Sequence, residues 1–472
     1  MWRGWRCRIR LMKIAFELHN DEFEYDIRGL LMAFFPGAEI VYRPDSREGF
    51  DHYFVFPESQ HAHKLDRKNE IKEKAYHMLR DLTGKTLPWG ALTGIRPVKL
   101  ATAMLHEGES KEGIAARMMR EHMVSRKKAR LAADIAAYEE EILAGLDYEN
   151  GYSLYVGIPF CPTTCLYCSF TSYPIGKWAS RADEYLDRLV MEMETVGGLM
   201  KGRKLQTVYV GGGTPTSLSP GQLLRLIEEI LRHFDVSGVL EWTVEGGRPD
   251  SITPEKLRVL KDSPVTRISI NPQTMQDETL KRIGRRHTVA ELVRAYEMAR
   301  NMGFDNINMD TILGLPGETA DDVRDTFEKL KALAPDSLTV HSLAVKRASR
   351  LRMEAEGTVV AGGTQEESEE MMRIAAAAAE SLRMRPYYLY RQKNMTGNLE
   401  NVGYCRSGAE GIYNILIMEE VQTICAIGAG TVTKGVFPDG RIERCENVKD
   451  IEQYLDRTEE MMERKRRLFL PS

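Results

Sequence analysis

The clearest pattern in the sequence is an alternation of short apolar runs and amphipathic stretches between about residues 151 and 342. The apolar runs predict strands at 154–157, 206–210, 240–245, 267–270, 306–312 and 337–342. Helical spacing of apolar residues predicts helices at 182–197, 221–234, 254–262, 276–283, 289–302 and 319–333. Repeated strand–helix units predict a parallel sheet with right-handed crossovers, and about six such units predict an incomplete (β/α)6 barrel.

The segments on either side of this region follow other patterns. Near the N-terminus, short strands and helices predict a small α/β module, from runs at 13–18, 23–35, 53–56 and 64–83. Towards the C-terminus, an alanine-rich helix at 368–382 and an aromatic run at 387–394 predict an α+β extension. The expected fold class is α/β. Its expected parts are the N-terminal module, a helical linker region, the partial barrel and a substrate-covering C-terminal domain, at 1–85, 86–150, 151–345 and 346–472.

Composition narrows the functional classes. The chain has 472 residues, 43% of them hydrophobic, so it can bury a full core. A net charge of −4 gives no overall nucleic-acid footprint, and we expect no nucleic-acid partner. No apolar run is long enough to span a bilayer, and the basic first eleven residues lack the apolar centre of a signal peptide. With cysteines that form no even framework, these features predict a cytoplasmic protein.

The candidate chemistry centres on three cysteines, Cys161, Cys165 and Cys168, in the spacing C-x₃-C-x₂-C. Thiolates on one tight loop can hold irons of a [4Fe–4S] cluster. Position 170 is a phenylalanine, so no fourth cysteine follows, and one iron would keep an open position for an exogenous ligand. Zinc is disfavoured because a second pair of ligands is missing nearby, and a disulfide because nothing indicates a secretory context.

Glycines and polar residues follow the later predicted strands, where barrel folds gather functional groups. The turn 211–216 reads Gly-Gly-Gly-Thr-Pro-Thr, and its glycines let the backbone approach a ligand with amides and carbonyls exposed. Four further polar residues end or follow strands and turns, namely Glu245, Gln273, Arg285 and Asp310.

These motifs together resemble the radical S-adenosylmethionine (SAM) enzymes. The lead-in Ile158-Pro159-Phe160-Cys161 is similar to that of the oxygen-independent coproporphyrinogen III oxidase family. The resemblance implies a radical SAM barrel with a [4Fe–4S] cluster on Cys161, Cys165 and Cys168, whose open iron is chelated by SAM. It covers most of the chain and is most specific over 152–320.

The resemblance also implies roles for individual residues. The backbone at Gly212, Gly213 and Thr214 would hold the SAM amino group, and Arg285 would face its carboxylate. The other residues implied at the cofactor are Tyr155, Tyr167 along the adenine, Glu245 and Asp310 near the ribose, and Gln273. For His287, a proton-donating or haem-ligating role stands against a helix-capping or hydrogen-bonded one, and the latter is favoured.

The implied activity is the anaerobic conversion of coproporphyrinogen III to protoporphyrinogen IX in haem biosynthesis, with flavodoxin or ferredoxin as electron donor. Because Phe170 replaces the fourth cysteine of the best-known oxidases, two alternatives stay open: a haem chaperone, and radical chemistry on another tetrapyrrole. Two interpretations of the aromatic run at 387–394 stay open. It forms either a strand packed on the core or part of a porphyrin pocket in which Arg391 and Lys393 meet propionates.

Overall fold

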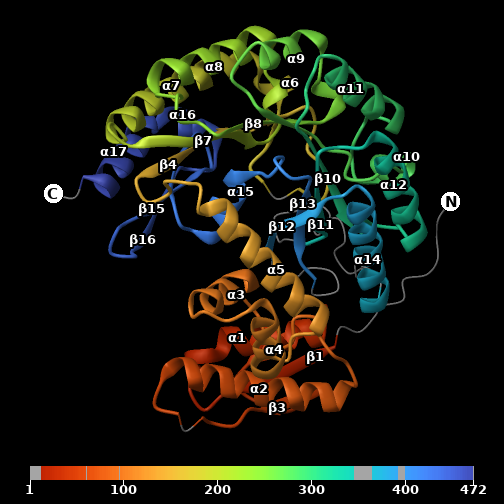
Figure 1. The fold of residues 1–472 in the computed structure, drawn as a ribbon. Coiled ribbons are helices and arrows are strands. Elements are labelled where there is room, and N and C mark those ends of the chain that lie inside the picture. The colour runs from red at the N-terminus through yellow and green to blue at the C-terminus, as the bar shows by residue number, and fades with distance from the viewer. Residues whose placement is uncertain are drawn as a thin grey trace. The chain divides into compact units, whose positions relative to one another are not determined.

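One sheet dominates the part of the chain that the computed structural model describes, which comprises residues 12–59, 61–94, 96–168, 170–344, 364–391 and 399–470. Within these residues the sheet has eleven strands in the order β12-β13-β11-β10-β9-β8-β7-β4-β14-β15-β16 (Figure 1). Its middle is parallel, with β4, β7, β8, β9 and β10 paired in succession. These strands are buried along most of their length, as expected where helices cover a parallel sheet.

The barrel region confirms the predicted strand–helix alternation. Its strands are β4 (Gly151–Ile158), β7 (Lys204–Gly212), β8 (Glu241–Gly247), β9 (Arg267–Ile270), β10 (Ile307–Leu313) and β11 (Ser337–Ser342). Its main helices are α7 (Ala182–Leu199), α8 (Pro220–His233), α9 (Pro254–Lys261), α10 (Asp277–Arg282), α11 (Val289–Asn301) and α12 (Ala320–Leu333). Capping boxes at Ser219, Thr288 and Thr319 start three of these helices, because each side chain satisfies an otherwise unpaired amide.

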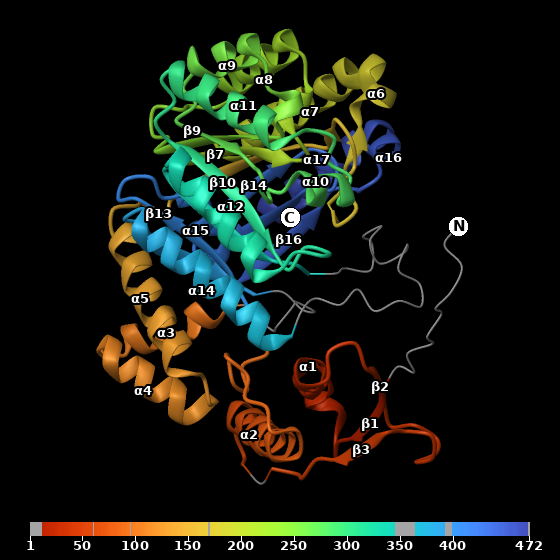
Figure 2. The same ribbon diagram turned by 90° about the vertical axis from the view of Figure 1, so that its right-hand side faces the viewer.

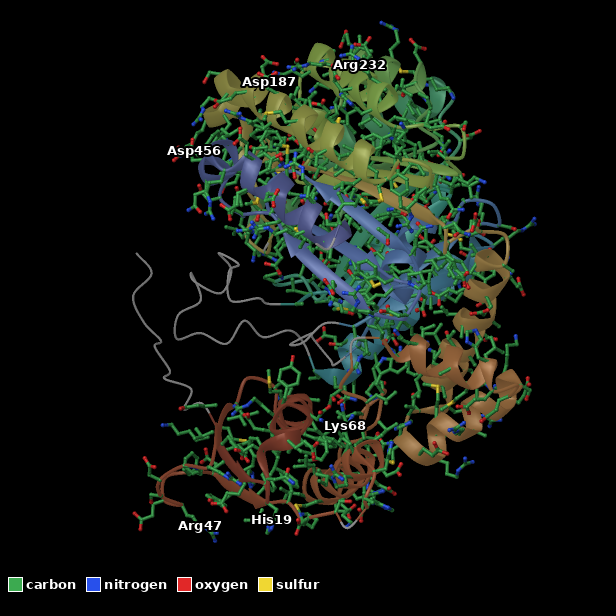
Figure 3. The ribbon with its side chains drawn as sticks, turned by 90° about the vertical axis from the view of Figure 1, so that its left-hand side faces the viewer. His19, Arg47, Lys68, Asp187, Arg232 and Asp456 are labelled. Atoms are coloured by element: carbon green, nitrogen blue, oxygen red, sulfur yellow. The ribbon has the colours of Figure 1, made fainter. Side chains whose placement is uncertain are left out.

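The helices form a layer outside the sheet (Figure 2). Their charged side chains project away from it, as Asp187 and Arg232 do in Figure 3, and the side chains of these two residues are 62% and 68% exposed. The outer faces of the helices therefore meet the solvent, and polar groups on the inner face and at the strand ends can serve a binding site.

The C-terminal segment continues the barrel sheet at both of its edges, which the sequence analysis did not anticipate. On one side β13 (Asn401–Cys405) pairs antiparallel with β11, and β12 (Arg385–Tyr390) lies beyond it. On the other side β14 (Thr423–Ile427) pairs parallel with β4. The segment also contains β15 (Val432–Val436), β16 (Ile442–Glu446), α14 (Gln365–Ser381), α15 (Ile412–Glu419), α16 (Ile451–Asp456) and α17 (Thr458–Phe469). The added strands satisfy backbone groups that an open edge would leave unpaired.

The aromatic run forms β12, which confirms the strand interpretation for Tyr387 and Tyr388, 0% and 5% exposed. Arg391 is buried, stacks on Trp89 at 5.7 Å and donates from Nη1 to the carbonyl oxygen of Leu92 at 2.6 Å. Lys393 lies outside the described residues.

The N-terminal module is built on a parallel sheet in the order β2-β1-β3. Its elements are β1 (Lys13–Glu17), η1 (Asp21–Phe23), α1 (Glu24–Phe34), β2 (Glu39–Tyr42), β3 (His52–Val55) and α2 (Lys64–Thr83), followed by α3 (Pro97–His106), α4 (Lys111–His122) and α5 (Arg126–Leu143). Strand β2 was not predicted. Its side chains are at most half-buried, so its apolar signal is weak.

Contacts group the chain into two units, Met1–Glu140 with Ser342–Glu370 and Leu389–Asn401, and Glu141–His341 with Met371–Tyr388 and Val402–Ser472. The four-part division proposed from the sequence remains a prediction. Among the described residues, none of the helices combines the length and the apolarity needed to cross a membrane.

Candidate functional site

The cysteine loop follows directly from the carboxyl end of β4. A short parallel pairing of Phe160 and Cys161 with Tyr173 and Pro174 closes its base, and the Tyr173 amide donates to the Pro159 carbonyl at 2.7 Å. The Leu166 amide donates to the Ile283 carbonyl at 3.0 Å. The loop is therefore fastened both to its own base and to the segment after α10.

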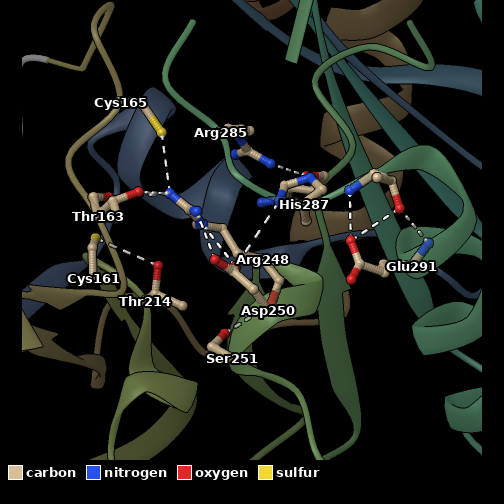
Figure 4. A network of polar contacts seen from close by, with 12 residues as sticks. Cys161, Thr163, Cys165, Thr214, Arg248, Asp250, Ser251, Arg285, His287 and Glu291 are labelled. Atoms are coloured by element: carbon tan, nitrogen blue, oxygen red, sulfur yellow. Dashed lines mark hydrogen bonds and ion pairs between the residues drawn. The ribbon is translucent and has the colours of Figure 1, made fainter. Parts of the chain in front are cut away.

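The three predicted cluster ligands lie on this loop with partly or largely buried side chains, and none is in a disulfide. The Thr214 hydroxyl donates to Cys161 Sγ at 3.4 Å, and Arg248 Nη1 donates to Cys165 Sγ at 3.7 Å (Figure 4). Burial raises the pKa of the Cys161 thiol to about 11 and also raises that of Cys168. Bound metal would be needed to hold such thiols as thiolates.

Among the described residues, no three His, Cys, Asp or Glu side chains converge on a single metal ion. A cluster does not require this, because each cysteine of a [4Fe–4S] cube binds a different iron. The donor set of three thiols on one short loop therefore fits a cluster and does not fit a mononuclear zinc site.

The glycine turn at the end of β7 packs directly on the cysteine loop. The Gly213 and Thr214 amides donate to the carbonyls of Ile158 and Phe160 at 2.8 and 2.7 Å. A Cβ on Gly213 would lie 2.6 Å from the Phe160 oxygen, and Gly212 has φ +102°, so neither position accepts a larger residue without strain. The expectation of exposed amides is wrong for Gly213 and Thr214, because both amides donate to carbonyls of the cysteine loop. A ligand's ammonium group is itself a donor, so the backbone groups of the turn that it can use are the carbonyls.

Three tyrosines and a carboxylate line the interior below this turn. Tyr155, Tyr209 and Tyr413 stack, with the closest ring centroids 4.6 Å apart. The Tyr209 hydroxyl donates to Glu245 Oε1 at 2.7 Å. Burial raises the pKa of Glu245 to about 7. Tyr209 and Tyr413 were missed by the sequence analysis. Tyr209 had a signal, because it lies two positions before Gly211 on the same face, whereas Tyr413 comes from a distant helix.

Gln273 and Asp310 lie on neighbouring segments of the sheet. Gln273 has φ +65°, its amide donates to the Asp310 carbonyl at 2.9 Å, and its buried Oε1 has no hydrogen-bond partner among the described residues. Burial acts to raise the pKa of Asp310, but His341, with Nε2 3.9 Å from the carboxylate, and a hydrogen bond from Asn308 at 2.7 Å outweigh it and hold that pKa below its usual value. A strained backbone at a polar residue is common at functional sites.

Arg285, Tyr167 and His287 come together beside the cysteine loop. Arg285 Nη1 donates to the Asn271 carbonyl at 2.5 Å and Nη2 to the Tyr167 hydroxyl at 3.3 Å, while Nε has no hydrogen-bond partner within the described part of the chain. The favoured capping or hydrogen-bonded role of His287 is wrong for the described residues, since neither ring nitrogen makes a hydrogen bond and the side chain is 0% exposed. Burial, followed by the charge of Arg285, lowers the pKa of His287 to about 4, so its ring is neutral.

These unpartnered atoms test whether the residues fit SAM. Gln273 contributes a buried acceptor, Arg285 a buried donor, and His287 one of each in its neutral form. Buried polar groups are rarely left unpaired, so a ligand with both donors and acceptors is indicated. The ammonium and carboxylate of the methionine part of SAM have this character, and the site fits it.

Comparisons with known proteins agree with this geometry. The Radical SAM superfamily profile matches residues 155–330. The oxygen-independent coproporphyrinogen-III oxidase-like protein HemZ of Bacillus subtilis is 45% identical over 405 residues, which cover 84% of this chain and 80% of that protein. The heme chaperone HemW of Bacillus subtilis is 39% identical over 195 residues, covering 41% of this chain and 51% of that protein.

Among solved structures, the coproporphyrinogen III oxidase HemN of Escherichia coli, a radical SAM enzyme, has a TM-score of 0.55 with 21% identity. The match covers 68% of this chain and 73% of that chain and shows a shared fold. The identity to HemZ extends over most of both proteins and decides the family. The chain belongs to the oxygen-independent coproporphyrinogen-III oxidase-like proteins of the radical SAM superfamily, which uses a [4Fe–4S] cluster and S-adenosylmethionine.

Proposed function

We propose that this protein oxidatively decarboxylates coproporphyrinogen III to protoporphyrinogen IX without oxygen. The observation that carries the proposal is the similarity to the oxidase-like protein HemZ, which is 45% identical over 405 residues. The heme chaperones HemW match over shorter stretches or at lower identity, 39% over 195 residues for the Bacillus subtilis protein and 26% over 306 residues for that of Haemophilus influenzae. The match to HemZ is longer than the radical SAM core at 155–330, so it includes segments outside that core.

The proposed cofactor site uses the residues that the sequence analysis selected. Cys161, Cys165 and Cys168 would hold the cluster. When bound, the cluster and SAM supply one-electron cleavage of SAM and a radical that abstracts hydrogen. The open iron position follows from the absence of a fourth cysteine in the loop.

The methionine part of SAM would lie against Arg285 and the carbonyls of the turn at Gly212 and Gly213. This arrangement pairs its carboxylate with a buried guanidinium and its ammonium with backbone oxygens. Asp310 stays ionised and suits a ribose hydroxyl as an acceptor, because its pKa is held low. Glu245 and Gln273 offer further acceptors, and Tyr155 and Tyr167 offer aromatic surface to the rest of the cofactor.

In the proposed reaction each reacting propionate loses a hydrogen atom from its β-carbon. Its carboxylate then leaves as carbon dioxide, one electron passes to an acceptor, and a vinyl group remains. The chain's own contribution is to hold the β-carbon next to the cofactor and to exclude water. A flavodoxin or ferredoxin is the proposed donor of the electron that SAM cleavage consumes.

The second candidate function is haem binding and delivery, which the similarity to HemW favours. A haem iron needs an accessible axial ligand. His287 does not offer one as the chain stands, because its side chain is 0% exposed. Haem delivery would therefore require a different ligand or a rearrangement of the site.

The test uses the full chain, reconstituted anaerobically with iron and sulfide, and incubated with reductant, SAM and coproporphyrinogen III. Mass spectrometry follows 5′-deoxyadenosine and the tetrapyrroles, with Cys165→Ala as the control. Formation of protoporphyrinogen IX, lost in the variant, is the expected result. 5′-Deoxyadenosine with an unchanged porphyrin would refute the substrate. Tight stoichiometric haem binding without turnover would support the chaperone, and a product of another mass would indicate different tetrapyrrole chemistry.

A further inference from the structure

Arg248 is a buried charged residue that takes no part in the cofactor contacts proposed above. It lies on the turn after β8, where the register between β8 and β9 shifts at Gly246 and Gly247. Gly247 has φ +62°, and a Cβ on Gly246 would lie 2.6 Å from the Ser269 carbonyl oxygen. A bulge of this kind re-aims the residues that follow it. The side chain of Arg248 consequently points to the cysteine loop (Figure 4).

One nitrogen of Arg248 contacts the loop at three points. Nη1 donates to the Thr163 carbonyl at 3.1 Å, to the Thr163 hydroxyl at 2.7 Å and to Cys165 Sγ at 3.7 Å. The side chain is 3% exposed. Because the guanidinium is always charged, the structure places a buried cation next to a proposed cluster ligand.

Asp250 fixes the orientation of this cation. Its two carboxylate oxygens accept from Arg248 Nε and Nη2 at 2.9 and 2.7 Å, a bidentate pair that leaves only Nη1 for the loop. His287 Nδ1 lies 3.9 Å from the same carboxylate. Asp250 is 28% exposed on its side chain, so it balances the arginine charge only in part.

We propose that Arg248 is a positioning residue for the iron–sulfur cluster, which holds the Thr163–Cys165 segment on the end of β8 and donates a charged hydrogen bond to the Cys165 sulfur. The inference rests on the proposed cluster ligands but not on the tetrapyrrole substrate. Hydrogen bonds to the sulfurs and nearby charge set the potential of such clusters. A donor and a cation favour the more negative, reduced state, so Arg248 makes the bound cluster easier to reduce.

The experiment compares Arg248→Met, Arg248→Lys and Asp250→Asn in the reconstituted full chain, with Arg225→Met as the control. Arg225 pairs with Asp187 at 2.5 Å on the outer helices, and in the described part of the chain no hydrogen bond or ion pair joins it to the cysteine loop. Iron content is measured first. Redox titration followed by electron paramagnetic resonance then gives the midpoint potential, without SAM or tetrapyrrole.

For Arg248→Met we expect the ratio of reduced to oxidised cluster at a fixed potential to fall about tenfold, equivalent to ~59 mV for one electron. Arg248→Lys keeps a charge but loses the fork, so its shift should be smaller. Asp250→Asn removes the balancing negative charge and should shift the potential the other way. Arg225→Met should change nothing.

An Arg248→Met protein with full iron content and the wild-type potential would overturn the proposal. If that variant takes up no iron, unchanged potentials in both Arg248→Lys and Asp250→Asn would overturn it equally. Full iron content in Cys165→Ala would instead overturn the cluster placement. Failure of coproporphyrinogen turnover in a protein with these shifts would count against the proposed substrate alone.

Discussion

The buried ion pair between Glu192 and Lys465 offers a sharp test of what holds the C-terminal helix to the barrel. Lys465 on α17 lies 2.7 Å from Glu192 on α7, and both side chains are 0% exposed. The Lys465 ammonium also donates to Asn447 Oδ1 at 2.7 Å. Glu192 accepts from the Gly428 amide at 2.8 Å and from the Tyr454 hydroxyl. The pair therefore joins two helices to the turn after β14.

The perturbation is Lys465→Met, which keeps an unbranched side chain as far as Cε and removes the charged ammonium group. It leaves Glu192 as a buried, uncompensated carboxylate. Removal of one partner from a buried pair costs about 3–5 kcal/mol of unfolding free energy. Since Glu192 keeps its other donors, we expect a value near the lower end, about 3 kcal/mol.

Urea unfolding followed by circular dichroism measures the change, with Glu192→Gln and the double variant completing a double-mutant cycle. Glu192→Gln keeps a hydrogen-bond acceptor but removes the charge. The double variant should therefore regain more than half of the unfolding free energy that Lys465→Met alone loses. The exposed pair of Arg225 and Asp187 is the matched control, and Arg225→Met should cost less than about 1 kcal/mol. A loss below about 1 kcal/mol in Lys465→Met, or strict additivity in the cycle, would refute the reasoning.

Three further predictions concern the candidate site. Gly213→Ala should weaken iron uptake and destabilise the protein by about 1–3 kcal/mol, because its Cβ would lie 2.6 Å from the Phe160 oxygen. The control is Gly221→Ala on α8, where an added Cβ would have no atom within 4 Å among the described residues, and it should cause neither effect. Folding raises the pKa of Glu245 from 4.5 to about 7, so the folded state binds the extra proton and stability falls by about 3 kcal/mol as the pH rises through that window. Glu245→Gln should remove that fall, seen as a smaller difference between urea midpoints at about pH 5 and about pH 8. The pKa of Glu318 is also raised to about 7, so Glu318→Gln should remove a similar fall in stability but should not weaken SAM binding. Equal SAM affinities in the two variants would contradict the role of Glu245. Arg285→Lys should weaken SAM binding about tenfold in equilibrium dialysis, because a lysine cannot replace the fork that meets Asn271 and Tyr167; unchanged affinity would place the SAM carboxylate elsewhere.

The sequence by itself predicted most of the barrel's elements and supplied most of the residues of the candidate site. Strands β9 and β11 and helix α2 begin and end where the apolar pattern predicts. The cysteine spacing predicted the iron–sulfur cluster and, with the glycine turn, carried the resemblance to radical SAM enzymes, because both motifs are local in the sequence. Gln273 and Asp310 were selected through the resemblance to radical SAM enzymes, and the structure places them on neighbouring segments, where the Gln273 amide donates to the Asp310 carbonyl.

Only the tertiary structure decided which distant segments complete the sheet and the site. The pairing of β14 with β4 joins residues more than 260 positions apart, from Thr423 against Tyr152 to Ile427 against Val156, and no local pattern encodes such a partner. Tyr413 reaches the tyrosine stack from α15, and Arg248 reaches Cys165 through a bulge. Hydrophobic periodicity reports which face of an element is buried, whereas long-range pairing and the aim of a side chain depend on the packing of the whole chain.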